Sequence, residues 1–372
     1  MQKPKIAWLG ATVLTLTALI AIVGVPIYAS MVGFDVWQIT FMVIGIIFTE
    51  ISITAGYHRL WTHRAYSAHW SVRLLLAFGG TLAVQNSILH WASDHRRHHR
   101  NVDDYDLDPY SAQRGFWYSH IGWMLREYNP NPDNNYENCP DLKRDPIVMW
   151  QHRYYVALAL GINFGFPILV GFIHGDVIGM MLLLGFARLV IAHHFTFFIN
   201  SLAHIWGSQP YSDKNSSKDN SFLAILTMGE GYHNYHHSFQ RDYRNGIRWW
   251  QFDPTKWLIR TFAWMGLANN LYRTPLEKIE SAKAAMMLSK TSKKLASLPQ
   301  ADVLLAKLHE EYDVLMHKIN DFSAAKLHWA EAKKAAILES YDLDALKDKV
   351  ETLKENFLQQ KKDWIVFNAS FA

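Results

Sequence analysis

Eight histidines gather in three short windows of this 372-residue chain, at residues 58–63, 95–99 and 233–237. Imidazole is the side chain that binds iron, zinc and copper ions most often, so this density indicates a metal site. Two of the windows place histidines at i, i+3 and i+4, which on a helix point to one side. The eight residues are His58, His63, His95, His98, His99, His233, His236 and His237. We therefore read the chain as a metalloenzyme.

A ninth candidate ligand is His204, which follows Asn200 by one helical turn. Nine imidazoles exceed the four ligands of a typical structural zinc site, and they suit two metal ions with five or six ligands each. The single cysteine, Cys139, excludes an intramolecular disulfide and an iron–sulfur cluster. Histidine is thus expected to supply most of the coordination.

Four apolar segments are long enough to cross a hydrocarbon core of about 30 Å at ~1.5 Å rise per residue. They are predicted at about residues 6–29, 36–57, 154–173 and 177–199. The first is not read as a cleaved secretory signal, because a second span follows almost at once. The predicted fold class is all-α: a four-transmembrane-helix integral membrane protein with a cytosolic helical cap and a helical C-terminal extension.

The charges of the short loops predict the orientation. Residues 30–35 and 174–176 contain no Lys or Arg, whereas the other ends of the spans are rich in both. The positive-inside rule therefore places both termini, and all three histidine windows, in the cytosol. The membrane would be the inner membrane of a bacterial cell or the endoplasmic reticulum of a eukaryotic one. Residues 70–91 are apolar, but the histidine windows before and after them are assigned to the same side, so this segment cannot cross the membrane once. It is expected to lie along the interface or to enter the membrane and return.

Composition divides the chain into two predicted domains. Residues 1–274 hold the spans and the histidine windows. Residues 275–372 lack glycine and are dominated by Ala, Lys, Leu and Glu, which predicts a cytosolic helical extension. The net charge of +4 is modest and no basic run is present, so a nucleic-acid partner is not expected.

The windows and their flanking residues resemble one enzyme family. The motifs are G-Y-H-R-L-W-T-H at 56–63, Q-N at 85–86 leading through Trp91 to D-H-R-R-H-H at 94–99, N-S-L-A-H at 200–204 and G-E-G-Y-H-N-Y-H-H at 229–237. In order, spacing and flanking residues this pattern is similar to the membrane-bound acyl-CoA Δ9 (stearoyl-CoA) desaturases. The resemblance covers roughly residues 41–250 and leaves out the extension.

This resemblance implies a non-haem di-iron centre whose ligands are the nine histidines, with Asn200 reaching an iron through a water. It also implies that Gln85, Asn86, Trp91 and Thr196 contact a fatty acyl-CoA, and that Ile46 lies near the blind end of its tunnel. Such a centre would use O2 and two external electrons to form a cis double bond, because no side chain can oxidise an unactivated methylene. Zinc accepts the same imidazoles and could replace iron in recombinant protein.

Several alternatives stay open. A di-iron alkane or lipid hydroxylase uses similar histidine windows, and an acyl-lipid desaturase would take a phospholipid-linked chain. No cytochrome b5-like haem motif is present, so the electron donor is expected to be separate: a cytochrome b5, a ferredoxin or a reductase. His193 and His194 are read mainly as structural residues, and the acidic run at 103–108 as a solvated loop. Arg188 could be a structural partner or could approach the substrate.

Overall fold

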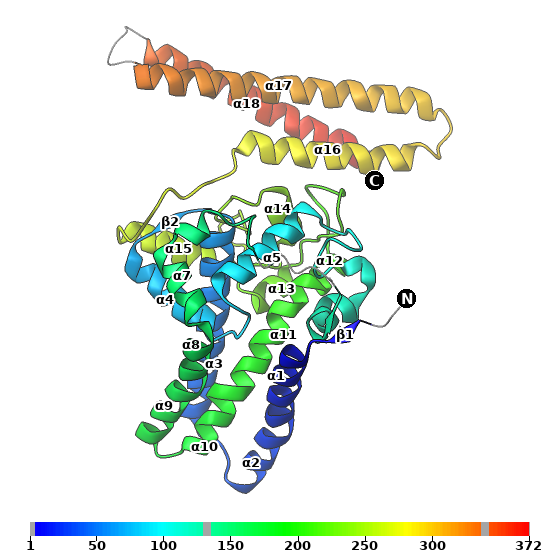
Figure 1. Cartoon of the computed structure of the whole chain (residues 1–372). Helices are drawn as coiled ribbons and strands as arrows, with labels where there is room; N and C mark the ends of the chain where they lie inside the picture. Colours follow the sequence, from blue (N-terminus) through cyan, green and yellow to red (C-terminus); the bar gives the residue numbers. More distant parts are fainter. Residues whose placement is uncertain (1–3, 129–134, 336–341, 372) are drawn as a thin grey trace. The chain divides into compact units, whose positions relative to one another are not determined.

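Four helices in the described part of the chain are long and apolar enough to cross a membrane (Figure 1). The structure, a computed structural model, describes residues 4–128, 135–335 and 342–371. The spans are Trp8–Met31, Val36–Thr62, Tyr155–His174 and Val177–Ile205, which confirms the predicted all-α class with four membrane helices. The second and fourth spans continue beyond their predicted ends, so they carry histidines out of the apolar region.

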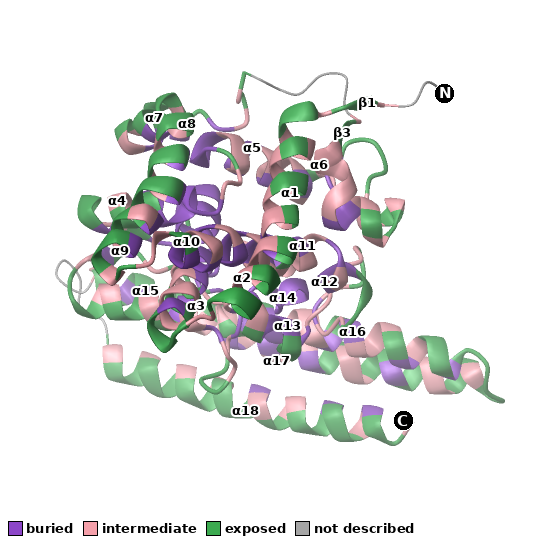
Figure 2. Cartoon of the chain, turned by 90° about the horizontal axis from the view of Figure 1, so that it is seen from below, coloured by how far each residue is buried: buried purple, intermediate pink, exposed green. Residues whose placement is uncertain are grey.

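Each span combines α-helix with a π-helical segment. The first differs most in burial, because 6% of its apolar window is buried against 56% in the fourth (Figure 2). Its surface is therefore available to lipid hydrocarbon. The α-helices are α1 (Trp8–Leu19), α2 (Val25–Met31), α3 (Val36–Ile51), α8 (Tyr155–Leu160), α9 (Phe166–His174), α10 (Val177–Met180), α11 (Arg188–Asn200) and α12 (Leu202–Ile205), and the π-helical segments are Ile20–Gly24, Ser52–Thr62, Gly161–Gly165 and Met181–Ala187.

Two aspartates organise the short loops at the far end of the spans. Asp35 begins α3 with a capping box, in which its carboxylate accepts first-turn N–H groups and Gln38 accepts the Asp35 N–H. Asp176 caps α10 and also accepts hydrogen bonds from Gln38 Nε2 at 2.7 Å and Tyr28 Oη at 2.8 Å. Three of the spans are thereby tied together at this end.

The opposite end carries the cap that surrounds the histidine windows. Its elements are mostly short, with two antiparallel pairs of two-residue strands. Strand β1, just before the first span, pairs with β3 of the cap. Strand β2, which follows the second span, pairs with β4 near the end of the cap. The elements are α4 (Trp70–Thr81), α5 (Ile88–Arg100), α6 (Trp123–Leu125), α7 (Pro146–Arg153), α13 (Ser221–Leu226), α14 (His233–Ser238), α15 (Pro254–Trp264), β1 (Lys5–Ile6), β2 (Ser67–Ala68), β3 (Arg126–Glu127) and β4 (Ala268–Asn269), with further helical turns at Ala112–Arg114, Tyr118–Gly122 and Leu142–Arg144.

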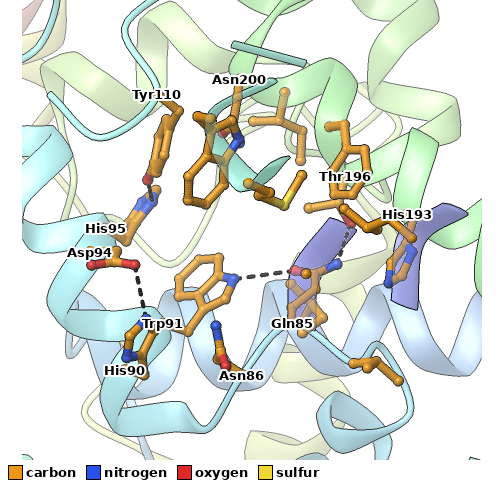
Figure 3. Close-up of a pocket in the computed structure, with 18 of the residues that line it drawn as sticks. Gln85, Asn86, His90, Trp91, Asp94, His95, Tyr110, His193, Thr196 and Asn200 are labelled. Atoms are coloured by element: carbon orange, nitrogen blue, oxygen red, sulfur yellow. Dashed lines mark hydrogen bonds and ion pairs between the residues drawn. The ribbon is translucent and has the colours of Figure 1, made fainter. Parts of the chain in front are cut away.

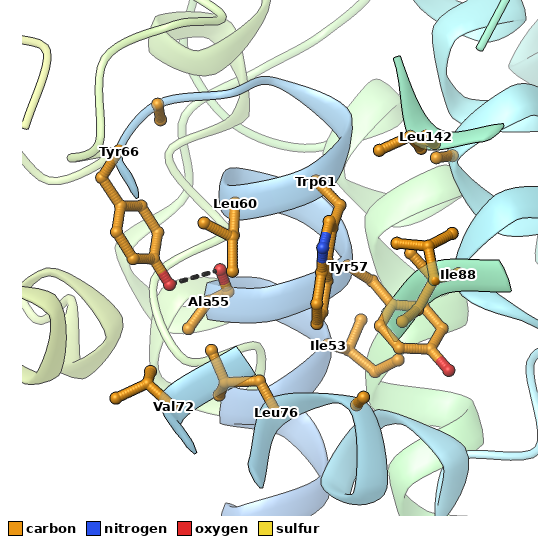
Figure 4. Packing of buried hydrophobic residues seen from close by; sticks show 14 of the residues in the cluster. Ile53, Ala55, Tyr57, Leu60, Trp61, Tyr66, Val72, Leu76, Ile88 and Leu142 are labelled. Atoms are coloured by element: carbon orange, nitrogen blue, oxygen red, sulfur yellow. Dashed lines mark hydrogen bonds between the residues drawn. The ribbon is translucent and has the colours of Figure 1, made fainter. Parts of the chain in front are cut away.

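The core of this unit lies where the π-helical end of the second span packs on α4 and α5 (Figure 4). Tyr57 and Trp61 project from the span into this core, and their rings meet edge to face with centroids 6.2 Å apart. Gly80 of α4 permits the contact, because a Cβ there would lie 2.2 Å from the Tyr57 ring. The histidines of the second span are thus mounted on a rigid, buried segment.

A second unit has its own core. Backbone contacts divide the chain into Met1–Ser208 with Lys214–Arg273, and Gln209–Asp213 with Thr274–Ala372. The second unit holds α16 (Leu276–Leu295), α17 (Ala301–Ala335) and α18 (Leu343–Ala369). Leu308, Leu315 and Phe357 are among the apolar side chains that pack between these helices. The described part of the extension is helical, as expected, and its independence as a domain stays a prediction.

Candidate metal centre

The predicted ligands come from four elements of the first unit. His58 lies in the π-helical segment Ser52–Thr62 and His63 follows it directly. Because the His63 N–H bonds to the His58 carbonyl at 3.0 Å, the five-residue spacing makes one turn, and the two rings lie 4.7 Å apart. Helices α5 and α14 supply three histidines each, and α12 supplies His204.

The structure brings all nine predicted histidines together in two groups. Within each group the potential ligand nitrogens lie within 4.8 Å of one another. The first group has five members, His58, His63, His95, His99 and His236, and the second has four, His98, His204, His233 and His237. Each group has enough nitrogens to hold one metal ion.

Distances between Nε2 atoms match the edges of a coordination sphere. In the five-histidine group the separations are 3.0 Å for His58 and His236, 3.0 Å for His95 and His99, and 2.9 Å for His99 and His236. Metal–nitrogen bonds of about 2.1 Å at right angles place two nitrogens about 3.0 Å apart. In the four-histidine group the separations run from 3.0 to 3.4 Å. The buried Nε2 of His63 has no hydrogen-bond partner, which also suits a ligand.

Four of the imidazoles have a polar partner at Nδ1, on the side away from the neighbouring histidines. Such partners fix the ring orientation and leave Nε2 as the ligand atom. The pairs are His58 with Glu230 Oε2 at 3.0 Å, His95 with Tyr110 Oη at 3.0 Å, His98 with Asp108 Oδ1 at 2.8 Å and His204 with Ser216 Oγ at 2.8 Å. None of these partners was predicted from the sequence.

The reading of residues 103–108 as a solvated loop is wrong for its two ends. Asp108 is 2% exposed and contacts His98. The hydroxyl and the N–H of Ser216 donate to the Asp103 carboxylate at 2.5 and 2.6 Å, so Asp103 supports the residue that contacts His204. The intervening Asp104 and Asp106 are exposed, as expected. The two ends differ from the middle because only Asp103 and Asp108 are held by partners at the site, Ser216 and His98.

Burial sets the protonation of the histidines in the cap. Desolvation, followed by the proximity of other imidazoles, holds their pKa values well below the ordinary value. This applies to His63, His95, His99, His233, His236 and His237. Neutral rings keep a lone pair for a metal ion, so the site is prepared for a cation at neutral pH.

Glu230 links the second span to the loop before α14. Burial alone would raise the pKa of Glu230, but the His58 imidazole and the Arg59 guanidinium hold it below the usual range. Arg59 Nη2 lies 3.0 Å from both Glu230 and Asp253, and Asn245 donates to Glu230 at 2.7 Å. One feature of the sequence could have indicated Glu230: it stands between two glycines directly before a histidine window.

A cavity of about 490 Å³ adjoins the histidines (Figure 3). Its volume is in the range of ligand sites. His58, His95 and His233 line it, and so do the predicted substrate and metal-site residues Gln85, Asn86, Trp91, Thr196 and Asn200. Apolar side chains of the first, third and fourth spans provide much of the remaining wall. The hollow can therefore hold an apolar chain beside the metal ligands.

A chain of hydrogen bonds crosses this cavity. Trp91 Nε1 donates to Gln85 Oε1 at 3.2 Å, and Gln85 Nε2 donates to Thr196 Oγ1 at 3.0 Å (Figure 3). Thr196 in turn donates to Glu50 Oε1 at 3.3 Å. The residues on both sides of Gln85 have positive φ, 52° at Val84 and 70° at Asn86, so the backbone is strained to present this amide.

Other predicted residues lie outside the two histidine groups. His194 faces His120 at 3.0 Å, which agrees with a structural role, whereas His193 faces the Ala83 carbonyl at 2.7 Å and also lines the cavity. Arg188 donates to the Leu82 carbonyl at 2.7 Å and to Asn163 at 2.6 Å, so it is a partner of buried polar groups. Ile46 is buried but is not among the residues that line the cavity, and its role stays a prediction.

Comparison with known proteins identifies relatives. The family model described as "Fatty acid desaturase" matches residues 35–268. A probable acyl-CoA desaturase of Schizosaccharomyces pombe is 46% identical over 64% of this chain and 50% of its own, and acyl-CoA desaturase 1 of Saccharomyces cerevisiae is 45% identical over 68% and 50%. An sn-2 palmitoyl-lipid 9-desaturase of Nostoc is 35% identical over 62% and 79%. The chain thus spans about half the length of the two yeast relatives.

Proposed function

We propose that this chain, which belongs to the fatty acid desaturase family, is an acyl-CoA desaturase that introduces a cis double bond at the Δ9 position of a saturated acyl chain. It is an integral membrane protein with four membrane helices. The observation that carries the proposal is the position of two histidine groups beside a largely apolar cavity. In the reaction, two hydrogens from adjacent methylenes, two electrons and two protons reduce O2 to two waters.

The proposed cofactor is a pair of iron ions. The five-histidine group would hold one, and the four-histidine group, with Asn200 through a water, would hold the other. When bound, the irons supply the activation of O2 that removal of hydrogen from a methylene requires. The fit rests on the nitrogen separations and on neutral, buried imidazoles. Zinc would fit the same nitrogens, and elemental analysis of the purified protein distinguishes the two metals.

The protein's own residues would position the acyl chain and exclude water. Apolar walls strip water from the chain, and Gln85, Asn86, Trp91 and Thr196 would fix its course beside the histidines. Ile46 is proposed to limit chain length from the second span. The carboxyl of Glu50 ends the hydrogen-bond chain and keeps the Thr196 hydroxyl pointing in one direction.

The loop charges support a cytosolic site. Both termini and the histidine groups would face the cytosol, where acyl-CoA and a separate electron donor are accessible. That donor would be a cytochrome b5, a ferredoxin or a reductase. The membrane would be the bacterial inner membrane or the endoplasmic reticulum, depending on the source.

A second candidate substrate is a lipid-linked acyl chain, which the similarity to the Nostoc acyl-lipid enzyme favours. Expression in a cell that lacks unsaturated fatty acids tests both. We expect these cells to grow without added unsaturated fatty acids and to contain Δ9 products. An assay in which purified protein is given either acyl-CoA or phospholipid shows which of the two is the substrate. His98→Ala is the inactive control. Hydroxylated products, or saturated lipids only, would contradict the proposal.

A further inference from the structure

A second hollow of about 310 Å³ lies beside the five-histidine group. Two of the candidate ligands, His63 and His99, form part of its wall. The large cavity is lined by different candidate ligands, and the two lining sets do not overlap among the described residues. The histidine groups are therefore approached by two separate hollows, one largely apolar and one polar.

The polar hollow is strongly basic. Its described lining contains four arginines and no acidic side chain: Arg64, Arg96, Arg100 and Arg241, with Thr62, His63, His99 and Gln240. Arg96 is bound in bidentate fashion by Asp141, at 2.7 and 2.9 Å, and so has a structural role. The side chain of Arg64 is 69% exposed, and Arg100 and Arg241 are exposed as well. These three guanidinium groups give the rim a positive charge that faces solvent.

The proposed reaction needs an electron donor close to the metal ligands but away from the substrate. For each double bond formed, the donor must deliver two electrons for the reduction of O2 to water, and the acyl chain would occupy the other hollow. Transient electron-transfer complexes have small interfaces in which complementary charge guides the encounter. A basic rim around two metal ligands meets both requirements for a carrier with an acidic surface.

We propose that this hollow is the docking site for an acidic one-electron carrier protein, with Arg64, Arg100 and Arg241 receiving its carboxylates and with His63 and His99 at the point where electrons enter. This inference rests on the function proposed above. The alternative anion, the phosphates of CoA, is disfavoured because an acyl chain bound here would not reach the apolar cavity without passing the histidines.

Binding measurements test the site without relying on turnover. The probes are the soluble haem domain of cytochrome b5 and a plant-type ferredoxin, both acidic, titrated against detergent-solubilised full-length protein at low and high salt. We expect Arg64→Gln/Arg100→Gln/Arg241→Gln to raise the Kd of the carrier that binds wild type by about tenfold or more at low salt, and to flatten the salt dependence. Anaerobic reoxidation of the reduced carrier on mixing with iron-loaded protein should slow in parallel.

A matched triple variant controls for net charge. Arg153, Arg248 and Arg260 are exposed and do not line either hollow, so their replacement by Gln should change Kd less than twofold. Equal weakening by both triples, absence of carrier binding to wild type, or weaker acyl-CoA binding with unchanged carrier binding would overturn the inference. Arginine-dependent carrier binding by a protein that forms no unsaturated product would instead overturn the proposed function.

Discussion

The buried histidines of this protein differ in the groups that their two ring nitrogens, Nδ1 and Nε2, contact. His98 presents Nε2 to His237 and is held at Nδ1 by buried Asp108. His120 is equally buried, but it bonds to Ser201 and His194 outside both histidine groups. Burial alone therefore does not mark a ligand, whereas convergence of Nε2 atoms does.

Metal counting separates these two kinds of histidine. Wild-type protein produced with iron should contain about two Fe per chain, and His98→Ala should lose activity and at least one ion, because it removes one of four nitrogens from its group. His120→Ala should keep both ions. Elemental analysis of purified protein measures this, and full iron content in the His98 variant would contradict its role as a ligand.

Glu50 is expected to act through the Thr196 hydroxyl. Glu50→Leu removes the terminal acceptor of the chain that reaches Trp91, so Thr196 and Gln85 lose their fixed orientation. We expect about a tenfold loss of turnover and a spread of double-bond positions. Glu50→Gln keeps an acceptor oxygen and should keep the wild-type position. Mass spectrometry of the products tests this, and unchanged products in the Leu variant would be the contrary result.

The site residues that could be predicted were those that belong to a short motif of neighbouring residues in the sequence. Histidine spacing was sufficient for eight of the nine members of the two groups, whereas the isolated His204 was proposed from its place one turn after Asn200 and from the family resemblance. Glu230 and Asp108 were missed because they meet histidines only after the chain folds back, and an isolated acidic residue carries no such spacing. Asp103 was misread because its neighbours Asp104 and Asp106 are solvated.

Among the elements, the π-helical end of the second span has the largest effect on the site. The sequence suggested that this helix ends near His58, whereas helical structure continues to Thr62. A five-residue spacing does not fit one face of an α-helix, but it fits a π-helical turn. Apolar periodicity could not reveal this, because the choice between the two helices depends on packing against α4 and α5.

At the far end of the spans, Asp176 is expected to contribute to stability alone. Asp176→Ala removes a helix cap and the acceptor for Gln38 and Tyr28, and caps contribute about 0.5–2 kcal/mol each. The thermal midpoint should fall by a few degrees with iron content unchanged. Asp106→Ala is the control, since its carboxylate is 85% exposed. Loss of iron from the Asp176 variant would show that this end also shapes the metal centre.

For the whole molecule, the buried histidines make the iron-free protein sensitive to acid. Their folded-state pKa values lie well below 6.5, so the unfolded state binds more protons as the pH falls through that value. Stability should be greatest above about pH 7 and fall below about pH 6.5, by up to about 1.4 kcal/mol per pH unit for each such imidazole. Thermal unfolding in detergent between pH 5 and 8 measures this. A flat profile would show that the rings are not buried without metal.

The two units make a further prediction at this scale. All nine histidines and the cavity lie in the first unit, and α16, α17 and α18 bury apolar side chains in a core of their own. A protein ending at Arg273 should therefore keep both irons and form the same double bond, although its lipid composition or partner interactions could change. Residues 274–372 expressed separately should be helical and unfold cooperatively, which circular dichroism can follow. Loss of the iron centre on truncation, with the separate extension unfolded, would mean that the extension is part of the catalytic fold.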